Sequence, residues 1–144
     1  MKAKDELGRR GEQLAVDHLV GAGYTIVQRN WRCTQGEIDI VAERRGVVVF
    51  VEVKTRSGLR YGHPFEAITV AKLARLKRLS AAWCEAHGAE ATAEGNSGDS
   101  DGDGGVDAAA ANRRRARRQI RIDAIGVVAP TGRPATIEHL EGIF

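Results

Sequence analysis

Two short segments rich in β-branched residues, 37–43 and 47–54, constrain the fold of this chain more than any other feature. Each has the length and composition of a β-strand, and the turn between them, 43–46, ends in glycine. We therefore expect an antiparallel hairpin. Because successive side chains of a strand point to opposite faces, these segments predict one apolar face and one face that carries charge.

The charged face of this hairpin is expected to bring two acids and a lysine together: Asp39 from the first strand, and Glu52 and Lys54 from the second. A two-residue turn at 44–45 places Asp39 opposite Phe50 and diagonal to the glutamate, whereas a four-residue loop places it directly opposite Glu52. Both registers leave the two carboxylates on one face. Only a three-residue loop would separate them.

Two neighbouring carboxylates repel each other, and a strand centre is a poor place to desolvate them. A divalent cation between them removes this repulsion, and carboxylate oxygens suit Mg²⁺ or Mn²⁺. Asp39 and Glu52 are therefore candidate metal ligands, with Lys54 placed to stabilise negative charge on a phosphate. The same pattern also fits a solvated sheet face on which Lys54 forms a surface ion pair, and the pattern alone leaves both interpretations open.

The rest of the chain predicts an α/β domain with a mixed sheet flanked by helices. The expected helices and strands cover 5–22, 24–32, 37–43, 47–54, 65–86, 120–129 and 136–140. Gly8 and Gly11 in the first helix indicate close packing, or close approach of a ligand, near its start. Glu12 lies at the margin of the apolar side of this helix, and it would join the two hairpin acids if the helix packs across the hairpin.

Residues 88–119 differ in composition from the rest of the chain. Their centre, 95–105, contains no apolar residue and cannot bury enough surface to offset the entropy lost on ordering. We interpret this segment as a disordered insertion within a single domain that spans 1–144. The strand pattern that resumes at Ile120 still needs the first half of the chain to form a core.

Composition favours a globular protein of the cytoplasm. No apolar run reaches the roughly 20 residues of a membrane-spanning helix, and the charged N-terminus leads into no signal core. The two cysteines, Cys33 and Cys84, fit neither a disulfide framework nor a zinc knuckle. The formal net charge of +3 is compatible with a polyanionic partner but does not require one. Lys72, Arg75 and Arg78 form either a solvated helix face or a phosphate-facing surface.

Four segments of the chain resemble those of a known family. They lie at 8–15, 29–42, 50–56 and 121–123, and the motifs GEIDIVA and FVEVKTR at their observed spacing are the most specific. The chain resembles the YraN family of uncharacterised bacterial proteins. That family in turn resembles the PD-(D/E)XK nuclease superfamily and, within it, the Holliday-junction resolvases. Ile38 stands where the superfamily usually has a proline.

The resemblance implies a restriction-endonuclease-like fold and an endonuclease, dependent on Mg²⁺ or Mn²⁺, that acts on DNA and favours branched or structured DNA. The implied metal ligands are Asp39 and Glu52, and the implied catalytic residues are Glu12, Asp39, Glu52 and Lys54. In this interpretation the contacts to backbone phosphate are Arg56, Lys72 and Arg75. Because resolvases are symmetric dimers, a homodimer is expected by analogy. The alternative is a non-catalytic nucleic-acid-binding protein that retains the nuclease fold.

Overall fold

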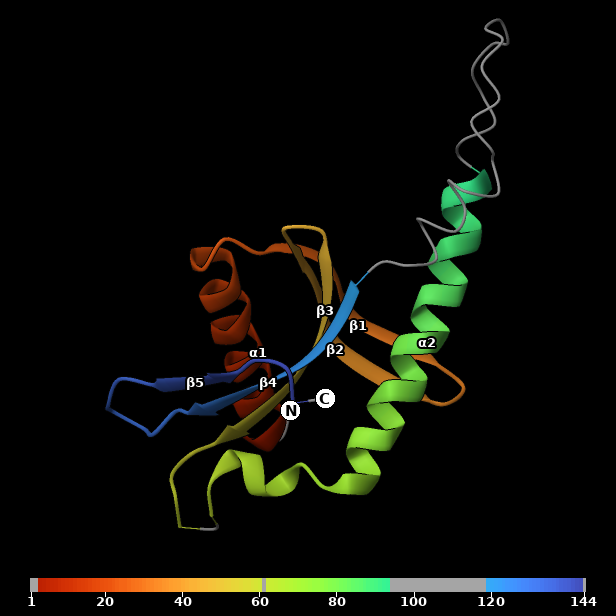
Figure 1. The fold of residues 1–144 in the computed structure, drawn as a ribbon. Helices are drawn as coiled ribbons and strands as arrows, with labels where there is room; N and C mark the ends of the chain where they lie inside the picture. The colour runs from red at the N-terminus through yellow and green to blue at the C-terminus, as the bar shows by residue number, and fades with distance from the viewer. Residues whose placement is uncertain (1–2, 61, 94–118, 144) are drawn as a thin grey trace, which may run out of the picture.

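The structure is a computed structural model that describes residues 3–60, 62–93 and 119–143 (Figure 1). Its elements are α1 (Ala3–Gly21), β1 (Thr25–Cys33), β2 (Gly36–Arg44), β3 (Val47–Arg56), the 3₁₀ helix η1 (Pro64–Ala67), α2 (Val70–Ala93), β4 (Gln119–Val128) and β5 (Thr136–Leu140). The strands form one sheet in the order β1-β2-β3-β4-β5. Only the β3–β4 pair is parallel among these neighbours. The predicted mixed sheet flanked by helices is confirmed.

Each face of the sheet has its own hydrophobic core, and α1 and α2 cover opposite faces (Figure 1). On one face Val49 and Val51 pack against Leu19 of α1. On the other face Phe50 packs against Trp83 of α2, with ring centroids 5.6 Å apart in an edge-to-face arrangement. Because β3 is paired on both sides and covered on both faces, its residues read as a nearly continuous apolar run.

The hairpin between β2 and β3 turns at Arg45 and Gly46, one residue later than the two-residue turn considered above. Both residues have positive φ, 50° and 78°, as a type I′ turn requires. Phe50 therefore pairs with Val41, and the register in which Asp39 lies opposite Phe50 is wrong. The register expected from a four-residue loop is the one observed, although the loop itself has two residues.

The long helix expected at 65–86 is two helices separated by a short break. Its second part, α2, begins after Thr69, whose Oγ1 accepts a hydrogen bond from the backbone N–H of Lys72 (3.2 Å). The helix continues to Ala93, because the alanine-rich sequence there favours helix. Part of the segment predicted to be a disordered insertion, 88–93, is therefore helical. The rest of that predicted insertion, 94–118, lies outside the described residues.

The start of α1 lies close over the end of β3 because Gly11 has no side chain. A Cβ at Gly11 would lie 1.9 Å from Oγ1 of Thr55, so no larger residue fits without moving the helix. Gly8, one turn earlier, would meet nothing within 4 Å. The close packing expected of the two glycines is thus confirmed for Gly11, whereas Gly8 borders open space.

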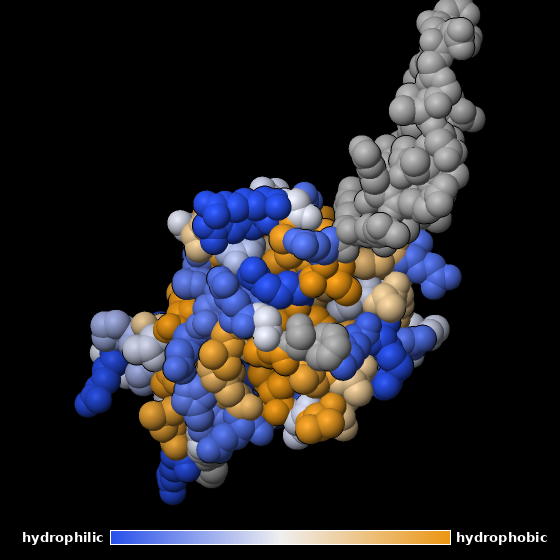
Figure 2. All heavy atoms as spheres, in the orientation of Figure 1, coloured by the Kyte–Doolittle hydropathy of each residue, from blue (hydrophilic) through white to orange (hydrophobic). Residues whose placement is uncertain are grey.

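The surface is mixed in character. Figure 2 shows hydrophilic residues over much of the α1 side and apolar residues between the two helices. The exposed large apolar residues, such as Val20 on α1 and Val70 at the start of α2, are scattered along the chain, which is ordinary for a protein surface. Within the described ranges, no helix has the length and apolar character needed to cross a membrane.

Candidate functional site

Asp39 lies where β2 changes the face that it presents. Ile38 and Ile40 would share a face in a regular strand, but Ile38 packs in the α2-side core and Ile40 in the α1-side core. The sequence-based expectation that both lie on one face is wrong. The change of face follows the point at which β2 stops pairing with β3, at Ile40 opposite Val51. Beyond it the backbone N–H of Val53 donates to Oδ2 of Asp39 (2.8 Å). The carboxylate of Asp39 thus takes the place of a backbone carbonyl as the hydrogen-bond acceptor for this N–H.

Glu52 and Lys54, from the neighbouring stretch of β3, form an ion pair. Nζ of Lys54 lies 3.1 Å from Oε1 of Glu52, and the two side chains are only 24% and 14% exposed. The ion pair of the solvated-face interpretation is therefore present, but the face is mostly shielded from water. An ion pair held in this way is less screened than one at the surface, so the charges of this site act strongly on one another.

Burial and the neighbouring acids raise the pKa of Asp39 to about 7, from an ordinary value of 3.8. Burial is the largest cause, followed by the negative charge of Glu52 and, to a smaller extent, that of Glu12. The hydrogen bond from Val53 and the positive charge of Lys54 act in the opposite direction. The buried position of Asp39 and its acidic neighbours thus oppose its ionisation more strongly than Val53 and Lys54 favour it.

Such a donor set fits a divalent cation. Buried, mutually repelling carboxylate oxygens are stabilised by a hard cation such as Mg²⁺ or Mn²⁺. Across the residues that the structure describes, no group of three or more His, Cys, Asp or Glu side chains is arranged to hold a metal ion. Asp39 and Glu52 would therefore supply at most two protein ligands, as is common for Mg²⁺, which retains several waters and binds substrate phosphate.

Glu12 borders the same site but is held from another direction. Its Oε1 accepts a hydrogen bond from Nδ2 of Asn30 (2.9 Å) and lies 3.4 Å from a guanidinium nitrogen of Arg29. Asn30 has a positive φ of 52°, so an irregular point of β1 faces α1 here. As expected for a helix that packs across the hairpin, Glu12 is close enough to Asp39 to affect its pKa.

A pocket of about 470 Å³ opens between the first turns of α1, the start of β2 and the end of β3. Its charged lining residues are the acids Asp5, Glu12, Glu37 and Asp39 and the bases Lys4, Arg9, Lys54 and Arg56. Among all described residues, Nε of Arg56 is the one buried side-chain nitrogen or oxygen that lacks a hydrogen-bond partner. The pocket thus joins the acid site to a cationic wall.

The basic residues predicted on α2 lie beside the site. The pKa of Lys72 is lowered chiefly by the positive charge of Lys54, which shows that the two ammonium groups are neighbours. Arg75 lies one turn further along α2, and its Cδ would be 3.8 Å from a Cβ at Gly36 in the β1–β2 turn. The structure therefore brings Lys72 to the acid pair and leaves Arg75 farther away, over the turn.

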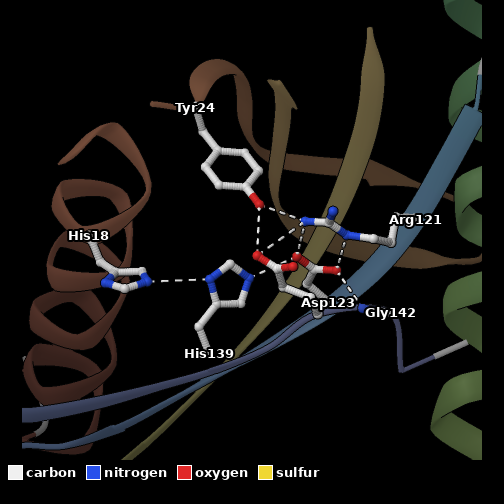
Figure 3. A network of polar contacts seen from close by, with 7 residues as sticks. His18, Tyr24, Arg121, Asp123, His139 and Gly142 are labelled. Atoms are coloured by element: carbon white, nitrogen blue, oxygen red, sulfur yellow. Dashed lines mark hydrogen bonds and ion pairs between the residues drawn. The ribbon is translucent and has the colours of Figure 1, made fainter. Parts of the chain in front are cut away.

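Sequence reasoning missed a second polar cluster, built around the fully buried Asp123 of β4 (Figure 3). Nε and one terminal nitrogen of Arg121 each lie 2.8 Å from a carboxylate oxygen, Nε2 of His139 lies 2.7 Å away, and the backbone N–H of Gly142 donates at 2.9 Å. Burial acts to raise the pKa of Asp123, but the hydrogen bonds from His139 and Arg121 outweigh it, and the pKa is lowered.

This cluster ties the end of the described chain to the first helix. Nδ1 of His139 lies 3.3 Å from Nε2 of His18 on α1, and Arg121 also donates to the hydroxyl of Tyr24 (2.6 Å). An acid within a buried strand, two residues after an arginine, was the available signal, since such an acid requires partners.

Comparison with known proteins shows similarity to one protein family. The family described as "Uncharacterised protein family UPF0102" matches residues 11–127. A UPF0102 protein of Clavibacter michiganensis subsp. michiganensis is 44% identical over 138 residues, 96% of this chain and 95% of its own. One of Pseudarthrobacter chlorophenolicus is 45% identical over 143 residues, 99% of this chain and 89% of its own. One of Arthrobacter sp. is 63% identical over 87 residues, 60% of this chain and 74% of its own.

Proposed function

Because this chain belongs to the uncharacterised protein family UPF0102, the YraN family that its motifs resemble, we propose a function from the site itself: a metal-dependent nuclease that hydrolyses phosphodiester bonds in DNA. The observation that carries the proposal is the partly buried Asp39–Glu52 pair with Lys54 in contact. A protein that only binds nucleic acid would gain nothing from clustered negative charge beside a phosphate.

In this proposal Asp39 and Glu52 hold Mg²⁺ or Mn²⁺. When bound, the cation supplies Lewis-acid polarisation of the phosphate and lowers the pKa of a bound water. Lys54 donates to a non-bridging phosphate oxygen and stabilises the negative charge that grows during attack. The hydrogen bond from Val53 fixes the orientation of the Asp39 carboxylate, so this ligand is set in place by the sheet before any substrate binds.

The remaining residues of the proposal surround this centre. Glu12, held by Asn30, would assist as an additional acid, and Arg56, Lys72 and Arg75 would contact backbone phosphate. Since the described residues present no recognition helix beyond the two that pack on the sheet, we propose selection by DNA shape, with branched or structured DNA as the preferred class. A homodimer is proposed by analogy alone and is tested by light scattering.

The test incubates the purified protein with four-way junction, flap and linear DNA in Mg²⁺, Mn²⁺ or EDTA. Metal-dependent cleavage that is lost in Asp39→Asn and Lys54→Ala supports the proposal. Glu43→Gln is the matched control, because Glu43 is an exposed acid on the same strand. Binding to these DNAs without metal-dependent cleavage of any of them would instead establish the alternative, a nucleic-acid-binding protein with a retained nuclease fold.

A further inference from the structure

We propose that the pocket at the start of α1 is a second phosphate subsite, which binds the phosphate adjacent to the one at Lys54 on the same DNA strand. Arg56, Arg9 and Lys4 form it. The identity of the ligand rests on the proposed nuclease function. The inference goes further, because it assigns a path to the strand and predicts that the site acts on internal phosphodiester bonds.

Arg56 is the central observation. Its Nε is buried without a partner, while its backbone is fixed, since the carbonyl accepts a hydrogen bond from the N–H of Ala129 (2.8 Å). A buried donor that lacks an acceptor is unfavourable. Arg56 and Lys54 both line the pocket. A phosphate there would accept from Nε and a terminal nitrogen together, the bidentate arrangement that suits guanidinium.

The first turns of α1 add two more cations to this wall, Lys4 and Arg9. No ion pair among the described residues includes Lys4, Arg9 or Arg56. In contrast, two acids of the pocket are already neutralised from outside it: Glu12 by Arg29, and Glu37 by Arg32 at 3.3 Å. The pocket therefore keeps its positive groups available for an anion.

The other side of the acid pair is also cationic. Lys72 approaches it from α2, and α1 and α2 cover opposite faces of the sheet (Figure 1). A DNA strand that passes from the start of α1 to the start of α2 would have a phosphate held on each side of the reacting one. Such a path requires nucleotides on both sides of the scissile bond.

The test measures binding of a fluorescein-labelled 20-nucleotide DNA, single-stranded and duplex, by anisotropy in EDTA over a range of salt concentrations. Each lost phosphate contact should reduce the slope of log Kd against log salt by about 0.7 to 0.9. At 0.1 M salt this corresponds to a Kd that is about five- to eight-fold higher. We expect this loss in Arg9→Gln and Arg56→Gln. Arg10→Gln should bind like the wild type, because Arg10 is also exposed on α1 but does not line the pocket.

Neutral methylphosphonate linkages then locate the contact along the strand. In the wild type, a single substitution at the adjacent position should weaken binding, and in Arg56→Gln that substitution should have no further effect. The effect of a methylphosphonate on the opposite side should persist in Arg56→Gln and disappear in Lys72→Gln. Arg56→Lys, which keeps the charge without the planar fork, should restore the salt slope but not the full affinity.

Slopes in Arg9→Gln and Arg56→Gln that equal those of Arg10→Gln would overturn the subsite, as would a wild type that binds neither DNA. Because Arg9 is exposed, its variant reports on binding even if Arg56→Gln is unstable in a thermal melt. The two proposals fail separately. If the slopes fall in Arg9→Gln and Arg56→Gln but the wild type cleaves no DNA, the subsite is supported and the nuclease is refuted. If the wild type cleaves DNA but the slopes of these variants are unchanged, the nuclease is supported and the subsite is refuted.

Discussion

Substitution of Asp39 by asparagine is expected to stabilise the folded protein at alkaline pH. The pKa of Asp39 is raised in the native state to about 7, from 3.8. Between these values the native state holds a proton on this group that the unfolded state has released, so the free energy of unfolding falls as pH rises. Below pH 3.8 Asp39 does not change the free energy of unfolding, and above about pH 7 it lowers that free energy by its full amount. Asparagine keeps an acceptor for the N–H of Val53 but never ionises.

The size of this effect follows from the pKa. A change from 3.8 to about 7 corresponds to on the order of 4 kcal/mol of unfolding free energy, at 1.36 kcal/mol per pH unit. The difference in stability between Asp39→Asn and the wild type should therefore grow by about this amount from pH 4 to pH 8. Other titrating groups, such as Asp123 and His18, are common to both proteins and cancel in the difference.

Urea denaturation in EDTA, followed by circular dichroism at pH 4, 5, 6, 7 and 8, measures this difference. Asp17→Asn is the control, because Asp17 is exposed on α1 and accepts a hydrogen bond from the exposed Gln13. The stability of this variant should stay within about 0.5 kcal/mol of the wild type at each pH. A stability difference between Asp39→Asn and the wild type that does not change with pH would refute the interpretation of Asp39 as a buried, repelled acid.

Three further predictions follow from the packing and the charges. Mg²⁺ at 10 mM should raise the Tm of the wild type at pH 8 but not that of Asp39→Asn, since only a ligand that binds the native state stabilises it; equal shifts in differential scanning calorimetry would argue against a cation at this acid. Gly11→Ala should lower the free energy of unfolding by about 1–3 kcal/mol, because its Cβ would lie 1.9 Å from Thr55 Oγ1, whereas Gly8→Ala should not; denaturant titration separates them. Asp123→Ala should lower the free energy of unfolding by about 3–5 kcal/mol, because it leaves Arg121 and His139 without their buried acceptor; a loss below 1 kcal/mol in the same titration would contradict a stabilising role for this buried carboxylate.

Local periodicity predicted the central strands well because β2, β3 and β4 each have neighbours on both sides. The apolar run of β3 and the spacing of apolar residues on α1 follow from burial on a central strand and on one helix face. The convergence of Asp39, Glu52 and Lys54 was also predictable, because a two-residue turn and a four-residue loop both leave these side chains on one face of the hairpin.

Features that depend on distant parts of the chain could not be predicted in this way. The change of face at Asp39 lies where β2 stays paired with β1 after its pairing with β3 has ended. The contact between His18 and His139 joins residues 121 positions apart, and no local pattern encodes it. The break before α2 is local, but apolar periodicity does not reveal it, because it is marked by the Thr69 cap.

The hydrogen bond between Val53 and Asp39 has a consequence for genetics. Asp39 both accepts this hydrogen bond within the sheet and carries a charge of the proposed metal site, so it cannot be varied for one purpose without affecting the other. In a random mutagenesis screen, most replacements at this position should register as poorly expressed protein before any defect in chemistry is visible. Asparagine is the exception, and a library scored for protein abundance and for activity together should isolate it from all other replacements at Asp39.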